Sequence, residues 1–446
     1  MHTSSIRRGG RRTRAAVVLA LLLVGAAGAP ATADGSRQKQ WFLDAMRAEE
    51  MWRTSTGEGV TVAVIDSGVD PTNPDLEGRV LSGKDFAPVG QPGNEHTDYD
   101  GHGTGMAGLI AGTGAYGGGR GAFGLAPGAK VLPIRLPKDG EAANEAAGIK
   151  IFNDALAPAI RYAADQGAKV INISSAASEG SPLVSAAVRY ALDRGSLIFA
   201  GVGNNGAKAN QVMYPAATPG VVGVAAVGQD LRRTAVSEYG PQVDMAAPGQ
   251  DMIHACGGKT GLCRSSGTSD ATALASASAA LIWSVHPDWT NNQVLRVMLN
   301  TLGAPTDGAK RNDSIGYGIV RPRIALTHPG NPGPADVYPL PDLKAAASAS
   351  PSAAPSEADK GADTAPAAAR DEGDDSVPWV AVVVGVAVLL AAVLAGVIVA
   401  ARRRRRAAVP PTTAVSGQLP YPAPGYGPPP GTSDPVHRPG SGPGGF

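Results

Sequence analysis

The chain has almost no net charge, since 39 basic residues stand against 38 acidic ones for a formal balance of +1. Such a balance gives no electrostatic preference for nucleic acid or for acidic substrates, so neither is predicted as a partner. Aromatic residues are scarce, at 5% of the sequence, while glycine (59) and proline (37) are abundant. This composition is typical of one loop-rich α/β domain of small residues followed by an unstructured stretch.

Cysteine is nearly absent as well, and its two copies, Cys256 and Cys263, bracket a hairpin-like loop. If the chain is exported, two cysteines so near each other are expected to form a disulfide. Free buried thiols or a metal pair are the alternatives, although two sulfurs without nearby histidine ligands make a poor zinc site. We predict no metal ion and no cofactor.

The N-terminal part has the composition of an export signal. An arginine-rich stretch precedes the apolar run Ala15–Ala29, and the small residues Ala31-Thr32-Ala33 come just before Asp34. This order predicts a signal peptide over residues 1–33. A retained N-terminal anchor is the alternative, but the apolar run is short for a membrane span.

A longer apolar run, over residues 379–401, contains no charged residue and is predicted to be a transmembrane helix. Arg402–Arg406 follow it directly, and several acidic residues within 371–375 precede it. By the positive-inside rule, the arginine end stays in the cytoplasm and everything before the span lies outside the cell membrane. An arginine cluster can also indicate nucleic-acid binding, but directly after a predicted span it indicates a stop-transfer signal.

Periodic apolar segments predict one folded domain over residues 56–328, preceded by a short extension over 34–55. Residues 329–378 are rich in alanine, serine, proline and acidic residues, and they are predicted to form a flexible stalk. Residues 402–446 hold the arginine cluster and a tail rich in proline and glycine, for which a docking role stays open.

Within the domain, short apolar runs alternate with helical stretches. The expected strands are Val60–Ile65, Lys130–Ile134, Val170–Ile173, Leu197–Gly201 and Val221–Val227. The expected helices are Gly103–Ala111, Asp154–Gln166, Pro182–Arg194, Asp270–Val285 and Asn291–Thr301. This alternation predicts an α/β fold with a mostly parallel sheet and helices on both faces. Active sites in such sheets gather at the carboxyl ends of the strands.

Four polar residues stand at places where such a sheet would present them. Asp66 ends a strand-like run, and His102 lies between glycines just before a helix of small residues. Asn204 follows a strand among glycines, and Ser269 opens a helix whose free N–H groups can stabilise an oxyanion. Taken singly, each has a structural reading: a turn former, a structural histidine, a turn asparagine and a helix cap.

Taken together, their contexts I-D-S-G, G-H-G-T, G-N-N-G and S-G-T-S occur in one order, and the sequence resembles the subtilisin family of serine peptidases. The resemblance implies a catalytic triad of Asp66, His102 and Ser269, in which the serine is the nucleophile and the histidine the general base. It also implies an oxyanion hole made by Asn204 and the Ser269 N–H.

The resemblance further implies a substrate-binding pocket shaped by backbone, with no fixed charge at its base. Its lining residues are Ser174, Ser175, Ala176, Gly201, Val202 and Gly203.

The sequence departs from the family pattern at Gly105, where the family usually has histidine, and at Ala273, where it usually has proline. At Asp270 it has an acid where the family usually has an apolar residue. Asp270 suits a helix N-terminus, but a charge near the oxyanion hole would lower turnover, so an inactive homologue is the alternative.

The layout of signal, extension, peptidase domain, stalk and single C-terminal span resembles the mycosins, the subtilisin-like proteases of type VII secretion systems. That resemblance implies an endopeptidase that processes exported proteins or peptides and supports the membrane complex that secretes them. A chiefly structural role in that complex is the competing hypothesis, and the permanent tether favours it.

Overall fold

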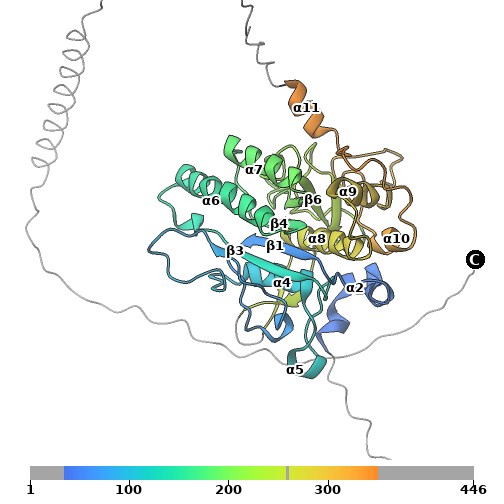
Figure 1. Cartoon of the computed structure of the whole chain (residues 1–446), viewed down its shortest axis with the longest axis horizontal. Coiled ribbons are helices and arrows are strands. Elements are labelled where there is room, and N and C mark those ends of the chain that lie inside the picture. Colours follow the sequence, from blue (N-terminus) through green and yellow to red (C-terminus); the bar gives the residue numbers. More distant parts are fainter. Residues whose placement is uncertain (1–34, 258–260, 350–446) are drawn as a thin grey trace, which may run out of the picture. The chain divides into compact units, whose positions relative to one another are not determined.

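The computed structural model describes residues 35–257 and 261–349 (Figure 1). The predicted signal peptide, the span at 379–401 and the tail at 402–446 lie outside the described residues. Within those two ranges, no helix combines the length and the apolar character needed to cross a membrane.

A parallel sheet forms the centre of the domain, and its seven strands within the described ranges follow the order β2-β3-β1-β4-β5-β6-β7. Their bounds are β1 Thr61–Asp66, β2 Lys84–Asp85, β3 Lys130–Arg135, β4 Val170–Ile173, β5 Leu197–Gly201, β6 Val222–Val227 and β7 Met245–Pro248. The five predicted strands are confirmed. The short β2 and the proline-ended β7 gave no strand-like apolar run, so the sequence did not predict them.

Helices cover both faces of this sheet, as expected (Figure 1). One face carries α6 (Glu145–Asp165) and α7 (Pro182–Asp193), and the other carries α4 (His102–Ala111) and α8 (Thr268–Val285). α6 was expected to begin at Asp154 but begins nine residues earlier, at Glu145, because the Asn144 side chain accepts a hydrogen bond from the Ala147 N–H and caps the helix there. The remaining helices are η1 Ser36–Lys39, α2 Trp41–Met46, α3 Ala48–Trp52, η2 Pro74–Leu76, α5 Tyr116–Gly119, η3 Asp139–Glu141, α9 Asn291–Asn300, α10 Pro322–Thr327 and α11 Asp342–Ala349.

The N-terminal extension is an integral part of the domain. Phe42, Leu43 and Met51 are buried in the core that α4 and α8 form on their face of the sheet. Gln40 is fully buried, and its amide nitrogen donates to the carbonyls of Phe123 at 2.7 Å and Ile253 at 2.9 Å. The extension therefore joins segments of the chain that lie far apart in sequence.

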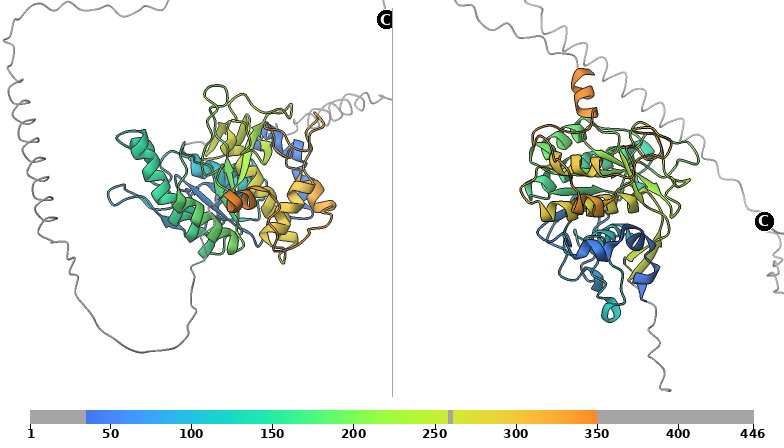
Figure 2. Two further views of the ribbon diagram at one scale, coloured as in Figure 1. Left: turned by 90° about the horizontal axis from the view of Figure 1, so that it is seen from above. Right: turned by 90° about the vertical axis from the view of Figure 1, so that its right-hand side faces the viewer.

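The folded domain also continues past residue 328, so the stalk predicted from 329 begins too early. Arg296 of α9 donates to the Pro332 carbonyl at 2.6 Å and to the Pro334 carbonyl at 2.9 Å, and Leu340 is buried. The Asp342 carboxylate accepts from the Gly220 N–H at 2.6 Å, and α11 then projects from the domain (Figure 2). The amino-acid composition did not predict that this segment belongs to the folded domain. The segment is held largely by hydrogen bonds to its backbone carbonyls, which composition does not reveal.

Candidate active site

The predicted site residues converge on the edge of the sheet where the strands end. Asp66 is the last residue of β1, and Ser174 follows β4 directly. Gly201 ends β5, three positions before Asn204. The helices α4 and α8, which begin at His102 and Thr268, bring the histidine and Ser269 to the same place.

Asp66 and His102 form the closest pair of the site. The Nδ1–H of His102 donates to Asp66 Oδ1 at 2.7 Å, and the Ser67 N–H donates to the same oxygen at 2.8 Å. Asp66 is 2% exposed, whereas the His102 side chain is 37% exposed. The Asp66 charge, opposed by desolvation, raises the pKa of His102 to about 9. When the imidazole is neutral, this contact keeps its hydrogen on Nδ1 and leaves Nε2 as the acceptor.

Asp98 connects the segments that carry these two residues, although no sequence motif pointed to it. Its Oδ1 accepts from the Ser67 hydroxyl at 2.7 Å and from the Gly101 N–H at 2.9 Å. Its Oδ2 accepts from the Thr104 N–H at 2.8 Å. Asp98 therefore connects the turn after β1 to the first turn of α4. The only sign of this role in the sequence is that an acidic residue stands four positions before His102.

Ser269 is the second residue of α8, and its N–H is among the first four of the helix, which have no partner within it. Its hydroxyl donates to the Ser174 carbonyl at 3.1 Å. Transfer of the hydroxyl proton to His102 therefore requires the hydroxyl to turn away from the Ser174 carbonyl. Catalytic hydrogen bonds are commonly loose without substrate, so this geometry is compatible with a nucleophile.

Asn204 has the orientation that an oxyanion hole requires. Its Oδ1 accepts from the Thr268 N–H at 2.9 Å and from the Thr268 hydroxyl at 3.2 Å. No acceptor for Nδ2 occurs among the residues that the structure describes, so both of its N–H groups are available to a ligand. The oxygen of Asn204 caps α8, and the nitrogen is left for substrate.

The predicted substrate-binding residues divide by exposure. Those that follow β4 (Ser174, Ser175 and Ala176) are partly exposed, and those at the end of β5 (Gly201, Val202 and Gly203) are buried. The fully buried Glu238, to which no sequence motif pointed, lies against Gly203 of this pocket. A Cβ placed on Gly203 would come within 2.4 Å of Glu238 Oε2. Burial raises the pKa of Glu238 and favours its neutral acid form.

The predicted disulfide is present, with 5.7 Å between the Cα atoms of Cys256 and Cys263. It closes an antiparallel hairpin of β8 (Met252–Ala255) and β9 (Leu262–Ser265), in which His254 pairs with Cys263. β9 ends shortly before Ser269, so the disulfide braces the segment that leads to α8.

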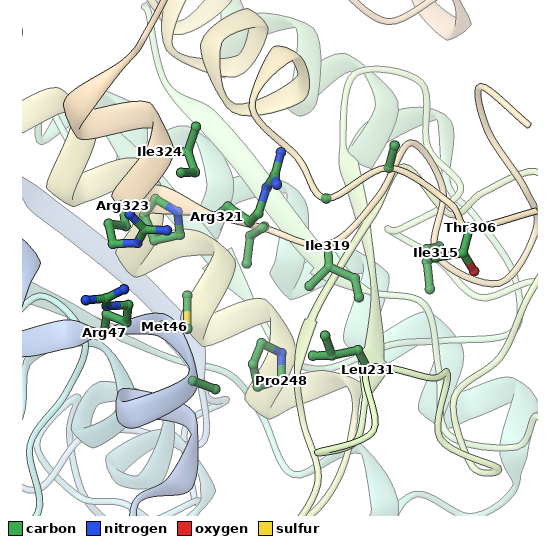
Figure 3. Close-up of a pocket in the computed structure, with 15 residues that line it drawn as sticks. Met46, Arg47, Leu231, Pro248, Thr306, Ile315, Ile319, Arg321, Arg323 and Ile324 are labelled. Carbon is green, nitrogen blue, oxygen red and sulfur yellow. The ribbon is translucent and has the colours of Figure 1, made fainter. Parts of the chain in front are cut away.

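A separate hollow of about 370 Å³ lies between the N-terminal extension and α10 (Figure 3). Its lining is mostly apolar and includes Arg47, Arg321 and Arg323, but no residue of the predicted triad and not Asn204. Arg321 already donates to the Thr301 carbonyl at 2.9 Å. The hollow is therefore distinct from the site at the sheet edge.

The model of the subtilase family, Peptidase S8, matches residues 57–318. The chain belongs to the subtilase family. Thermitase of Thermoactinomyces vulgaris is 35% identical to this subtilase over 55% of the chain and 82% of thermitase. The thermophilic serine proteinase of Bacillus sp. (strain AK1) is 37% identical over 52% of the chain, which spans about half (54%) of that relative.

Solved structures confirm the narrower resemblance to the mycosins. MycP1 of Mycobacterium smegmatis superposes on this subtilase with a TM-score of 0.58 and 29% identity, covering 70% of the chain and 90% of MycP1. MycP3, a protease of the type VII (ESX-3) secretion system, gives a TM-score of 0.57 and 32% identity, covering 67% and 90%. This subtilase is thus a subtilisin-like serine protease related to the MycP proteins.

Proposed function

We propose that this subtilase is a membrane-anchored, extracytoplasmic endopeptidase that cleaves proteins exported by a type VII secretion system. The observation that carries the catalytic part is the 2.7 Å contact between His102 and Asp66 at the edge where Ser269 and Asn204 also lie. The predicted signal peptide and the predicted span at 379–401 support the location, with the peptidase domain outside and the tail in the cytoplasm.

In the proposed reaction, the Ser269 oxygen attacks the carbonyl carbon of a peptide bond while His102 Nε2 takes the hydroxyl proton. Asn204 Nδ2 and the Ser269 N–H hold the negative oxygen of the tetrahedral intermediate. His102 then gives its proton to the leaving amine, which breaks the carbon–nitrogen bond. Water hydrolyses the resulting Ser269 ester by the same route.

The first test is covalent labelling of the full chain in detergent with a fluorophosphonate. Because the probe reacts only with an activated serine, we expect one modified residue, Ser269, identified by peptide mass spectrometry. Ser269→Ala and His102→Ala should each abolish the label while retaining the circular dichroism spectrum of the wild type. A folded wild-type protein that stays unlabelled would point to the inactive homologue.

The second test is the pH dependence of kcat/KM for a small peptide ester. Only neutral His102 accepts the serine proton, and its pKa is raised to about 9, chiefly by the Asp66 charge. We therefore expect kcat/KM to rise with pH and to level off only above about pH 9. A plateau reached already at neutral pH would show that the pKa of His102 in the free enzyme is not raised, and the pH profile of Asp66→Asn would then show whether Asp66 acts on that pKa at all.

A structural role in the secretion complex is a second candidate function. The periplasmic assembly from the ESX-5 inner membrane complex has a chain that superposes on this subtilase with a TM-score of 0.59 and 25% identity, covering 78% and 92%. Assembly requires the folded surface and the span, whereas proteolysis requires the four site residues.

This difference can be tested in the producing cell. We expect Ser269→Ala to abolish processing of exported proteins while leaving their export largely intact, because the folded surface is preserved. Deletion of the gene, or replacement of 379–401 so that the domain is released, should stop export. If export continues at the wild-type level after deletion, the hypothesis of a structural role in secretion is contradicted. A block by Ser269→Ala as complete as deletion would instead make catalysis the essential step.

A further inference from the structure

A buried carboxyl group beside the predicted substrate-binding pocket lacks a partner. Glu238 is 0% exposed, and neither of its carboxyl oxygens makes a hydrogen bond with any residue that the structure describes. Arg233, five residues earlier, donates instead to the Thr234 and Ser237 carbonyls. The Asn205 N–H favours the charged form of the carboxyl, but the two groups do not reach hydrogen-bond geometry. Buried polar groups are normally paired, so this one requires an explanation.

Main-chain contacts hold Glu238 against the end of β5. Its N–H donates to the Gly203 carbonyl at 3.0 Å. Gly203 has a φ of 112°, which favours glycine, and a Cβ there would come within 2.4 Å of Glu238 Oε2. The Gly203 N–H donates to the hydroxyl of Thr268, the residue before Ser269, at 3.3 Å. Gly203 thus stands between the carboxyl and the residue that precedes the nucleophile.

A methionine from a third segment lies at the same point. A Cβ on Gly203 would come within 2.8 Å of Met213 Cγ as well, so Met213 and Glu238 are neighbours. Tyr214, the next residue, exchanges two backbone hydrogen bonds of 2.8 Å with Ala177. Ala177 directly follows the predicted substrate-binding residues after β4. Met213 therefore connects the two predicted sides of the pocket, with Glu238 beside it.

We propose that Glu238 gives this pocket a preference for a basic side chain, so that the enzyme cleaves after lysine or arginine. The proposal rests on the proposed function and names the class of its substrates. An ammonium or guanidinium group carries the charge and the N–H donors that the two unpartnered oxygens lack. The aliphatic stem of such a side chain would pack on Met213, which is half-buried and of a residue type that adapts to its contacts.

The state of Glu238 before substrate binds favours this pairing. Folding has already removed the carboxyl from water, so only the substrate cation loses hydration when the pair forms. Burial favours the neutral acid in the empty pocket, and a cation beside the carboxyl favours the charged form again. Norleucine has the carbon chain of lysine without the ammonium, so it would leave the carboxyl unpaired. Lysine should therefore be favoured over norleucine.

Binding alone tests this preference, whether or not the enzyme is active. In the full chain carrying Ser269→Ala, calorimetry compares two peptides that differ only in having lysine or norleucine before the target bond. We expect the lysine peptide to bind at least about tenfold more tightly. Adding Glu238→Gln keeps the shape and removes the charge, so the two affinities should then agree within about twofold. Equal affinities in the chain that retains Glu238 would overturn the proposal.

Turnover by the wild-type chain is the second measurement. We expect kcat/KM to be at least about 100-fold higher for the lysine peptide than for the norleucine peptide. In Glu238→Gln this ratio should fall to about one, while kcat/KM for the norleucine peptide changes no more than about threefold. Glu179→Gln is the matched control, because Glu179 is an exposed acid two residues after Ala177, and it should keep the wild-type ratio.

The outcomes separate this proposal from the proposed function. A wild-type ratio near one, or faster turnover of the norleucine peptide, overturns the proposal while fluorophosphonate labelling of Ser269 still supports the protease. An unlabelled wild type contradicts the proposed function, and the binding ratio still decides the role of Glu238. Should Glu238→Gln fail to fold, the two ratios measured with Glu238 in place remain decisive. A loss of preference as large in Glu179→Gln as in Glu238→Gln would assign it to the surface charge and overturn the proposal.

Discussion

Replacing Asp66 with asparagine is expected to lower kcat about 10⁴-fold while KM changes little. The carboxylate accepts the Nδ1 proton of His102 at 2.7 Å and so keeps Nε2 free to take the Ser269 proton. An asparagine in its place can turn its N–H toward the ring and favour the opposite tautomer, in which Nε2 already carries a hydrogen. Removing the charge also lowers the pKa of His102, because that charge is the main cause of its rise.

The measurement is steady-state hydrolysis of a peptide ester by Asp66→Asn, with active-site titration to correct for the folded fraction. Asp70→Asn serves as the control, since this acid lies on the same turn but contacts Thr72, at 2.8 and 2.7 Å. We expect the control to retain activity within about twofold. A loss below tenfold for Asp66→Asn would mean that His102 is oriented by other groups, with the Asp98 network as the first alternative.

Replacing Asn204 with alanine is expected to lower kcat about 100- to 1,000-fold, the loss typical of one oxyanion donor. Because Asn204 Oδ1 also caps the Thr268 N–H, part of any loss could arise from a frayed start of α8. Asn204→Asp separates the two contributions, since it keeps the acceptor for Thr268 but has no N–H to offer an oxyanion.

If donation to the oxyanion is the main role, Asn204→Asp should be at least as slow as Asn204→Ala, because its carboxylate also repels the oxyanion. The exposed neighbour Asn205 provides a matched control, and Asn205→Ala should remain near the wild-type rate. A change confined to KM in Asn204→Ala would instead show that this residue only shapes the substrate site.

Local patterns in the sequence predicted the five inner strands, the main helices and the disulfide. Local periodicity placed Asp66, His102, Asn204 and Ser269 at strand ends or helix starts, but only the resemblance of their four motifs to the subtilisin family identified them as site residues. The parallel sheet then brings such positions to one edge.

What the sequence did not predict depends on contacts between distant segments. Asp98 matters because it bonds to Ser67 and Thr104. Glu238 lies against Gly203, more than thirty residues away in the chain (238 − 203 = 35). No periodicity or composition encodes these pairings, since they are fixed only when the elements pack.

The late position of α8 in the chain determines when this protease can first cleave other proteins of the cell that makes it. A nascent chain that has emerged as far as β6 carries Asp66 and His102 but no nucleophile. β1 lies between β3 and β4, and α8 packs across β1, β4, β5, β6 and β7, so this face of the core closes only when α8 arrives. The late arrival of α8 delays assembly of the site until the domain is nearly complete, and products truncated before Thr268 are proteolytically inert.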